Sequence, residues 1–192
     1  MTLSRERILQ AALALADRDG IDALSMRKLG KELGVEAMTL YYYVPNKDAV
    51  LDGLVELVVA RVDVRTEGPW RVWARNYALS FRRELLAHPA LLPVVAVRPV
   101  ATPGGLATVE RAAAALVAEG FTPTGALHVI TSVSTFVVGQ TLAEVPSGES
   151  SPDFSAYPTL AAAVAAGLGT PEDHRDRFAY ALDALLSGLS PR

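Results

Sequence analysis

The chain contains no cysteine, which excludes disulfide frameworks, thiolate zinc sites and cysteine nucleophiles. Histidine is scarce: the three residues His88, His128 and His174 lie far apart in the sequence, without the short ligand spacing of a histidine-rich metal site. We therefore expect neither a bound metal ion nor a cofactor.

Long apolar runs are missing as well. No stretch approaches the ~18 uninterrupted apolar residues of a membrane-spanning helix. The first residues, from Met1 to Glu6, lack the apolar run of a signal peptide. The sequence therefore predicts a soluble, cytoplasmic protein with no membrane partner.

Basic residues are unevenly distributed. All three lysines, Lys28, Lys31 and Lys47, lie in the first 47 residues. Residues 1–50 carry 7 Lys and Arg against 7 Asp and Glu, whereas the remainder carries 11 against 14 and accounts for the net charge of −3. That net charge argues weakly against a nucleic-acid partner. A neutral segment with clustered bases, joined to an acidic body, is nevertheless compatible with DNA binding through one end.

The alternation typical of β-strands is absent, and apolar residues recur instead at helical spacing. At 192 residues the chain has room for one domain, or for two if one is small. The pattern predicts an all-α fold with loops at 103–105 and 145–155 and a short apolar segment at 91–97. The expected helices span 5–19, 26–33, 36–43, 47–64, 69–87, 106–119, 123–144, 159–168 and 171–186.

The segment 26–43 fits a helix-turn-helix. Its two helices cross steeply, so the first needs a small residue at the crossing, and the turn needs a residue that adopts positive φ. Gly30 and Gly34 occupy these places. Apolar contacts that would lock the pair come from Leu29, Leu33, Val35 and Leu40. The glycine spacing alone is equally well explained by chance or by ordinary helix packing.

A specific resemblance begins at this segment. The run MRKLGKELGVEAMTLYYYVPNK, residues 26–47, closely resembles the DNA-binding segment of TetR-type repressors, in which LGV…TLYxxVxNK closes the motif. RNYALSFR (75–82), AEGF (118–121) and VSTFVVG (133–139) are similar to later helices of the tetracycline-repressor branch. The resemblance implies an all-α homodimer, with a three-helix DNA-binding domain at 1–46 and a larger helical ligand-binding and dimerisation domain at 47–192.

For the DNA-binding domain, double-stranded operator DNA is the implied partner. Successive helical positions point about 100° apart, so the three adjacent tyrosines cannot all pack inward. By resemblance Tyr41 and Tyr43 contact phosphates while Val44 packs inward, and the role of Tyr42 stays open. Arg27 is the best candidate for a contact with guanine, because two N–H groups of its guanidinium match the O6 and N7 atoms of that base in the major groove. The predicted DNA-binding residues are Arg27, Lys28, Ala37, Met38, Thr39, Tyr41, Tyr42, Tyr43 and Lys47.

Two positions of the reading helix depart from the tetracycline repressor. Ala37 and Met38 replace its polar-then-proline pair, so they offer only apolar contacts, for instance to a thymine methyl. Thr39 can reach a phosphate or a base edge. We therefore expect the operator to differ at the matching base pairs.

In the body, Tyr77 and Phe81 lie four positions apart, on one face of the predicted helix. Aromatic residues at such helical spacing are by default core residues, but the resemblance makes these two the walls of a ligand pocket. Val95 and Ala143 stand where the tetracycline repressor places its metal-binding His and Glu. Because an isopropyl group cannot replace an imidazole as a ligand, we expect a hydrophobic small-molecule inducer without magnesium. His128 could be a core, interface or ligand residue. The predicted ligand-binding residues are Tyr77, Phe81, Val95, Leu127, Ile130, Thr131, Ser134 and Gln140.

The helices at 122–144 and 171–186 are apolar over much of their circumference, which predicts burial by other helices. A four-helix interface between two copies satisfies this, as does an intramolecular bundle.

The resulting hypothesis is a ligand-responsive DNA-binding repressor, not an enzyme. The alternatives are a helical interaction or adaptor protein without DNA binding, or an enzyme. Thr102-Pro103-Gly104-Gly105 is not a phosphate-binding loop, because no Lys-Ser/Thr follows it. No carboxylate pair or His–carboxylate constellation stands out either.

Overall fold

The computed structural model describes residues 2–98, 100–145 and 153–191, and all regular secondary structure within them is helical. The fold is therefore all-α, as the sequence predicts. In chain order the elements are α1 (Arg5–Asp19), η1 (Ile21–Ala23), α2 (Met26–Leu33), α3 (Ala37–Leu40), α4 (Lys47–Arg61), α5 (Trp70–Ala87), η2 (Pro89–Leu91), α6 (Leu92–Val97), α7 (Pro103–Ala118), α8 (Pro123–Leu142), α9 (Pro158–Ala165) and α10 (Pro171–Gly188).

Side-chain caps fix where the first helices begin. Ser4, Ser25 and Asn46 each accept a hydrogen bond from the backbone N–H three residues later, at 3.2, 3.2 and 2.8 Å. Such a cap satisfies an otherwise unpaired donor and stabilises a helix by about 1 kcal/mol. Gly34, at φ 70°, ends α2 in the left-handed region. These boundaries confirm those predicted from the sequence.

Several boundaries predicted from the sequence were wrong. The helix expected at 47–64 ends at Arg61, and the helix expected at 159–168 ends at Ala165. The third helix, expected at 36–43, ends at Leu40, and the three tyrosines follow in a turn whose N–H groups bond three residues back. The expected loop at 103–105 is the first turn of α7. Thr102 caps this turn through Gly105 N–H at 3.2 Å, and a proline at the first helical position has no N–H to leave unpaired. Most of the predicted loop at 145–155 lies outside the described residues.

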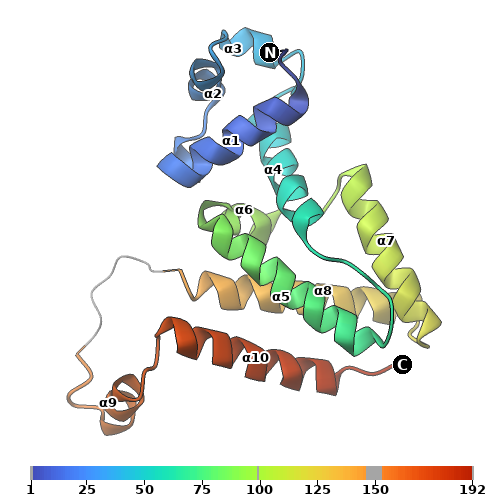
Figure 1. Ribbon diagram of the computed structural model, residues 1–192, viewed down its shortest axis with the longest axis vertical. Helices are drawn as coiled ribbons and strands as arrows, with labels where there is room; N and C mark the ends of the chain where they lie inside the picture. Colours follow the sequence, from blue (N-terminus) through green and yellow to red (C-terminus); the bar gives the residue numbers. More distant parts are fainter. Residues whose placement is uncertain (1, 99, 146–152, 192) are drawn as a thin grey trace.

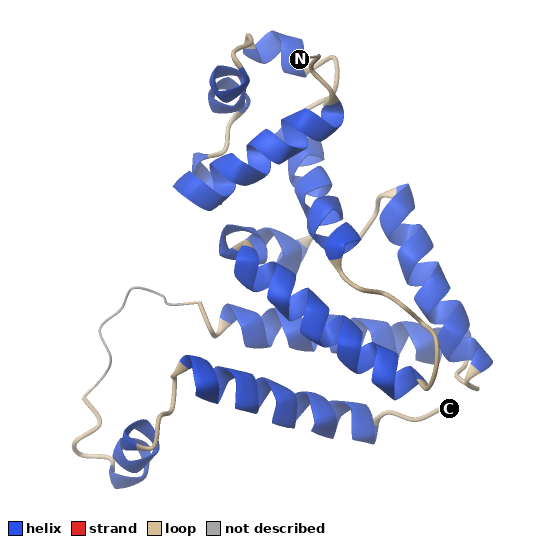
Figure 2. Cartoon of the chain, in the orientation of Figure 1, coloured by secondary structure: helices blue, strands red, loops and turns tan. Residues whose placement is uncertain are grey.

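The helices form two groups that α4 connects (Figure 1). α1, α2 and α3 lie at the end of the molecule that carries the N-terminus, while α5, α8 and α10 run alongside one another in the body (Figure 2). α4 packs on α1 at one end and on α5, α6 and α7 at the other. One apolar core runs through both groups, from Ile8 in α1 to Leu186 in α10.

Polar contacts also hold the two groups together. His88, at the end of α5, has Nδ1 2.8 Å from Oδ2 of Asp17 in α1 and Nε2 2.9 Å from Nη1 of Arg61 in α4. A guanidinium can only donate, so Nε2 accepts and Nδ1 carries the proton given to Asp17. Arg5 of α1 pairs with Glu56 of α4 at 3.1 Å. These contacts fix the orientation of α1 on the body.

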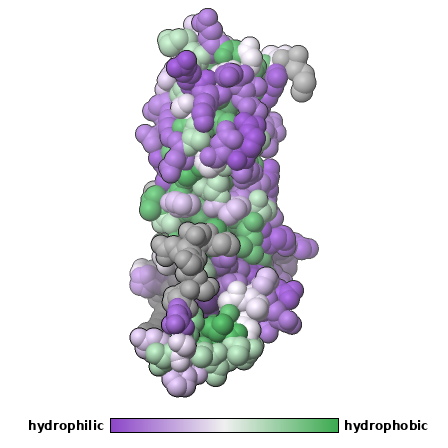
Figure 3. All heavy atoms as spheres, turned by 90° about the vertical axis from the view of Figure 1, so that its left-hand side faces the viewer, coloured by the Kyte–Doolittle hydropathy of each residue, from purple (hydrophilic) through white to green (hydrophobic). Residues whose placement is uncertain are grey.

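The two ends of the molecule differ in surface character. Figure 3 shows hydrophilic side chains gathered over the α1–α3 end and more apolar ones toward the opposite end. α9 belongs to that opposite end and has no buried residue. Its large exposed apolar side chains are Leu160 and Val164, with Tyr157 and Leu168 beside them.

Among the described residues, α8 alone is long and apolar enough to cross a membrane by length and composition. The core helix of a soluble protein passes the same test, and α8 packs against α5, α6, α7 and α10. This packing explains its apolar composition.

Gly30 tests the packing of the first domain. A Cβ there would lie 2.8 Å from the carbonyl oxygen of Val35 and 3.1 Å from the amide nitrogen of Ala37, both backbone atoms. We expect Gly30→Ala to lower the free energy of unfolding by about 1–3 kcal/mol, because α3 must move away from α2. Denaturant unfolding measures this. Gly188→Ala is the control, since its Cβ meets nothing within 4 Å. Equal stability of both variants would contradict the close crossing.

Candidate functional site

The α2–α3 pair forms a compact head at one end of the molecule. Leu29 and Leu40 are fully buried between the helices, and α2 ends at Gly34, which starts the turn. Of the residues predicted to bind DNA, Arg27, Lys28, Met38, Tyr41, Tyr42, Tyr43 and Lys47 are exposed, and Ala37 and Thr39 are half-buried. The head therefore presents these side chains on its surface while its apolar residues face inward.

The tyrosine turn resolves a question that the sequence left open. Tyr42 is 88% exposed, against 44% for Tyr41 and 41% for Tyr43, while Val44 is buried. All three tyrosines therefore point outward, and none belongs to the core. The turn leads directly into α4, where Lys47 is the first helical residue behind the Asn46 cap. A phosphate at this point would meet both the ammonium group and the positive end of the helix dipole.

Not every basic residue near this surface is available to a ligand. Arg18 bonds Glu32 through two nitrogens, at 3.1 and 3.0 Å, and bonds Asp19 at 3.1 Å. These carboxylates raise the pKa of Arg18, chiefly through the hydrogen bonds that Glu32 accepts from it, and Arg18 lowers the pKa of Glu32 in turn. Arg18 is thus committed to neighbours within the domain.

A second candidate site lies in the body, where a cavity of about 480 Å³ opens between α4, α5, α6, α7 and α8. Seven of the eight predicted ligand-binding residues line it: Tyr77, Phe81, Val95, Leu127, Ile130, Thr131 and Ser134. The cavity is within the size range of small-molecule sites and mostly apolar, as such sites usually are.

Gln140 does not line this cavity, contrary to the prediction. The lining residues of α8, including Ile130, Ser134 and Val138, recur every four positions along one face. Gln140 lies two residues beyond Val138, about 200° around the helix, so it faces away. His128 is exposed and likewise absent from the lining, which removes it from the cavity.

Several lining residues were missed at the level of sequence. Val55 and Val59 come from α4, Thr108 and Leu116 from α7, and Arg98 from the end of α6. Each of these helices carries an ordinary apolar stripe that sequence alone assigns to the core. The one sequence feature that could have indicated a cavity residue was the position of Arg98 directly after a short apolar segment.

A hydrogen bond joins α5 to α8 across the wall of the cavity. The hydroxyl groups of Tyr77 and Ser134 lie 2.8 Å apart, and the ring of Tyr77 packs against Phe81 with centroids 5.7 Å apart. Burial raises the pKa of the Tyr77 hydroxyl, since its ionised form would lose water. The group stays neutral and can donate or accept a hydrogen bond.

Arg98 links the cavity to the first turns of α4. Its Nη1 lies 2.6 Å from Oδ1 of Asp52, and its Nη2 lies 2.5 Å from Oδ1 of Asp48. These carboxylates, Asp52 first, raise the pKa of the guanidinium, which is charged at every physiological pH. The pair of contacts attaches the end of α6 to the helix that carries Lys47.

Within residues 2–98, 100–145 and 153–191 no three His, Asp or Glu side chains are grouped to hold a metal ion. Val95 presents only methyl groups to the cavity. Ala143, at the end of α8, has no side-chain ligand either. The neighbouring Glu144 is engaged by Arg82, with nitrogen–oxygen distances of 2.8 and 2.6 Å.

Comparison with known proteins finds matches over both groups of helices. Residues 8–54 match the family described as bacterial regulatory proteins, tetR family, and residues 65–192 match the tetracyclin repressor-like C-terminal domain. The tetracycline repressor protein class D of Escherichia coli is 34% identical over 97% of this chain and 89% of its own length. An HTH-type transcriptional regulator of Saccharopolyspora erythraea is 40% identical over 74% of this chain, which spans 61% of that relative.

Solved structures show the same fold. The TetR family protein ActR of Streptomyces coelicolor, in complex with actinorhodin, is 30% identical, with a TM-score of 0.81 over 98% of this chain and 97% of that one. A TetR variant of Acinetobacter baumannii in complex with minocycline is 31% identical, with a TM-score of 0.77 over 97% and 96% of the two chains. These matches cover both the DNA-binding head and the body. The chain is a member of the TetR family of transcriptional regulators, which are not enzymes.

Proposed function

We propose that this regulator binds a palindromic operator as a homodimer and is released from it by a mainly hydrophobic small molecule. The observation that carries the proposal is the connection of the two sites by one helix: α4 begins beside the tyrosine turn and contributes Val55 and Val59 to the cavity. A ligand in the cavity therefore touches the helix that positions the head. This mode of action places the protein in the cytoplasm.

On the DNA, the exposed side chains of the head have different roles. Arg27 reads a guanine in the major groove, and Ala37 and Met38 make apolar contacts with bases. Thr39 reaches a phosphate or a base edge. Phosphate contacts come from Tyr41, Tyr43 and Lys47, with Lys28 and Tyr42 beside them, and these set position and orientation without reading sequence.

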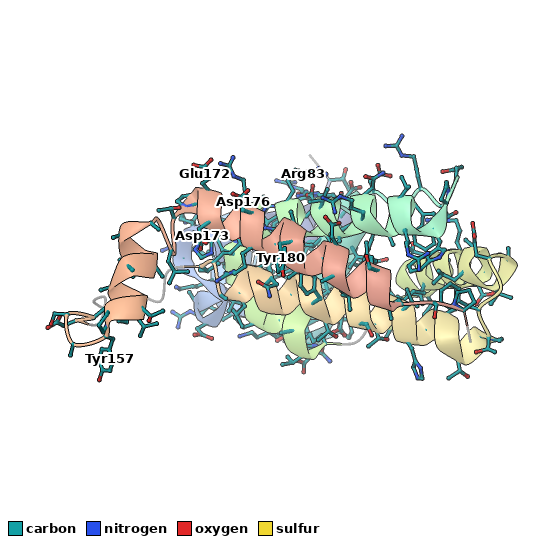
Figure 4. All side chains as sticks on the ribbon, turned by 90° about the horizontal axis from the view of Figure 1, so that it is seen from below. Arg83, Tyr157, Glu172, Asp173, Asp176 and Tyr180 are labelled. Atoms are coloured by element: carbon teal, nitrogen blue, oxygen red, sulfur yellow. The ribbon has the colours of Figure 1, made fainter. Side chains whose placement is uncertain are left out.

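The homodimer covers apolar surface that one chain leaves exposed. On α8, Leu127 and Leu142 are 48% and 49% exposed, and on α10 Tyr180 is 80% exposed. Figure 4 shows Tyr180 midway along α10, on the face turned away from the other helices of the body. A helix that is apolar and only partly covered needs a further partner. A second copy supplies it with the same two helices and brings two heads to one operator.

The ligand binds by burying apolar and aromatic surface against Tyr77, Phe81 and Ile130, without a metal ion. Hydroxyl groups of Thr131 and Ser134 orient it. The relatives with solved complexes support a small-molecule ligand, since their structures contain actinorhodin and minocycline. The ligand releases DNA to the extent that it prefers a dimer whose heads no longer match successive major grooves.

Base reading by Arg27 and phosphate binding by Lys47 are separable. Selection of binding sites on the purified protein should recover a short palindrome. Arg27→Ala should relax preference at one symmetric position by about 1–3 kcal/mol, whereas Lys47→Ala should weaken all sequences alike and reduce the salt dependence. Arg111→Ala, exposed on α7, is the control and should change neither property. Recovery of no palindrome at moderate salt would refute operator binding of this kind.

The dimer is tested by mass. Light scattering should give about twice the 20.4 kDa of the chain at micromolar concentration. Tyr180→Asp should shift the protein toward monomer, because it places a charge in the interface, while Tyr42→Asp at the other end should not. A stable wild-type monomer would remove the basis for palindromic recognition.

Independence from magnesium is tested by release of the selected palindrome. A panel of hydrophobic metabolites should include compounds that release DNA and raise the melting temperature equally with and without EDTA, because Val95 offers no donor atom. Tetracycline with magnesium is the comparison compound. Release by tetracyclines alone, abolished by EDTA, would show that the cavity has been misinterpreted.

A further inference from the structure

Arg98 is the one permanently charged side chain among the described residues that line the cavity. The other lining residues are apolar or carry a single hydroxyl group. A lone cation beside an apolar space is costly unless an anion accompanies it. In this structure the accompanying anions, Asp48 and Asp52, come from outside the cavity.

The arrangement around Arg98 has a solvent side and a cavity side. Asp48 and Asp52 are 73% and 52% exposed at their side chains, whereas Arg98 is 24% exposed. The hydrogen bonds to these two carboxylates use Nη1 and Nη2. Nη1 also donates to the carbonyl oxygen of Asp48 at 3.5 Å. A guanidinium has five N–H donors in a plane, so Nε and the second hydrogen of Nη2 are further donors of the same charged group.

We propose that the ligand of the cavity carries a carboxylate, which pairs with Arg98 in competition with Asp48 and Asp52. This inference rests on the proposed ligand site and adds the chemical class of its occupant: a hydrophobic acid. A planar guanidinium binds a carboxylate through two parallel hydrogen bonds, and such a pair is strengthened where water is excluded. The two aspartates lie in solvent, where their attraction is weaker.

The competition gives the acid a direct effect on the DNA-binding head. Asp48 follows Lys47 in the first turn of α4, and its contact with Arg98 holds that turn to the end of α6. A carboxylate that takes over Arg98 releases the contact. An uncharged ligand of the same shape fills the cavity but leaves Arg98 paired with Asp48 and Asp52 of α4.

The test uses matched pairs of acids and amides. The probes are 2-naphthaleneacetate and 1-pyrenebutyrate, each with its primary amide, and their affinities for the full-length protein are measured by calorimetry at pH 7. For at least one pair we expect the acid to bind about tenfold or more tightly than its amide. Arg98→Gln should abolish this preference by weakening the acid alone, and Asp48→Asn with Asp52→Asn should strengthen the acid alone several-fold.

The control variant is Arg65→Gln, which removes an exposed arginine paired with Asp63 outside the cavity and should leave the preference intact. Unchanged binding of the amide by Arg98→Gln shows that its cavity is formed. If that variant does not fold, Arg98→Lys takes its place and should reduce the preference without abolishing it, since an ammonium lacks the planar fork.

The outcomes separate this inference from the function on which it rests. Equal binding of acid and amide, or a preference that survives Arg98→Gln, would overturn the acid as ligand and leave a hydrophobic cavity in place. Failure of every acid and amide to bind would overturn the cavity as a ligand site, and with it the role of Arg98. A preference that Arg98→Gln removes and the asparagine variants increase supports the proposal.

Discussion

The packing of α4 against both halves of the molecule is the constraint on which the rest of the structure depends. Near its middle, Gly53 lies so close to Leu9 of α1 that a Cβ there would be 2.5 Å from the leucine side chain. Two residues later, Val55 lines the cavity. A 15-residue α-helix is a rigid rod roughly 22 Å long, so a displacement at the cavity cannot be absorbed within it. The head must follow, or α4 must separate from α1.

Polar contacts join α4 to the same neighbouring helices as its apolar packing does. Arg5 and Glu56 join it to α1, and Arg61 joins it to His88, which also bonds Asp17. Arg98 joins its first turn to α6. Most of these pairs are at least partly exposed, and pairs of this kind contribute little stability individually. Their effect is to select one orientation of the head among several that an apolar contact alone would permit.

The apolar surface of the body has a different origin. The core of one chain takes one face of α8 and of α10, through Val133, Val137, Phe178 and Leu182. Leu127 and Leu142 of α8, Tyr180 of α10, and Leu160 and Val164 of α9 stay at the surface. A short helix without buried residues gains little from its own hydrogen bonds in water, because nucleation is unfavourable and propagation only weakly favourable. This exposed apolar surface is what the proposed homodimer covers.

Sequence by itself determined the helical class and most helix starts, because these depend on local signals, and its resemblance to a known family identified the helix-turn-helix. Ser25 and Asn46 cap wherever their backbone is extended, and Gly34 permits positive φ whatever surrounds it. These features follow from the chain within a few residues of each position.

Only the tertiary structure decided which apolar stripes enclose a cavity and which charges meet beside it. Gln140 was assigned to the cavity although it lies two residues beyond Val138. Two residues along an α-helix turn a side chain by about 200°, from the cavity face to the opposite face. Arg98 went unnoticed because its partners, Asp48 and Asp52, lie 50 and 46 residues away in the sequence. No local rule brings such groups together. Their meeting depends on how α4, α6 and α7 pack, and that packing is settled by the whole core at once.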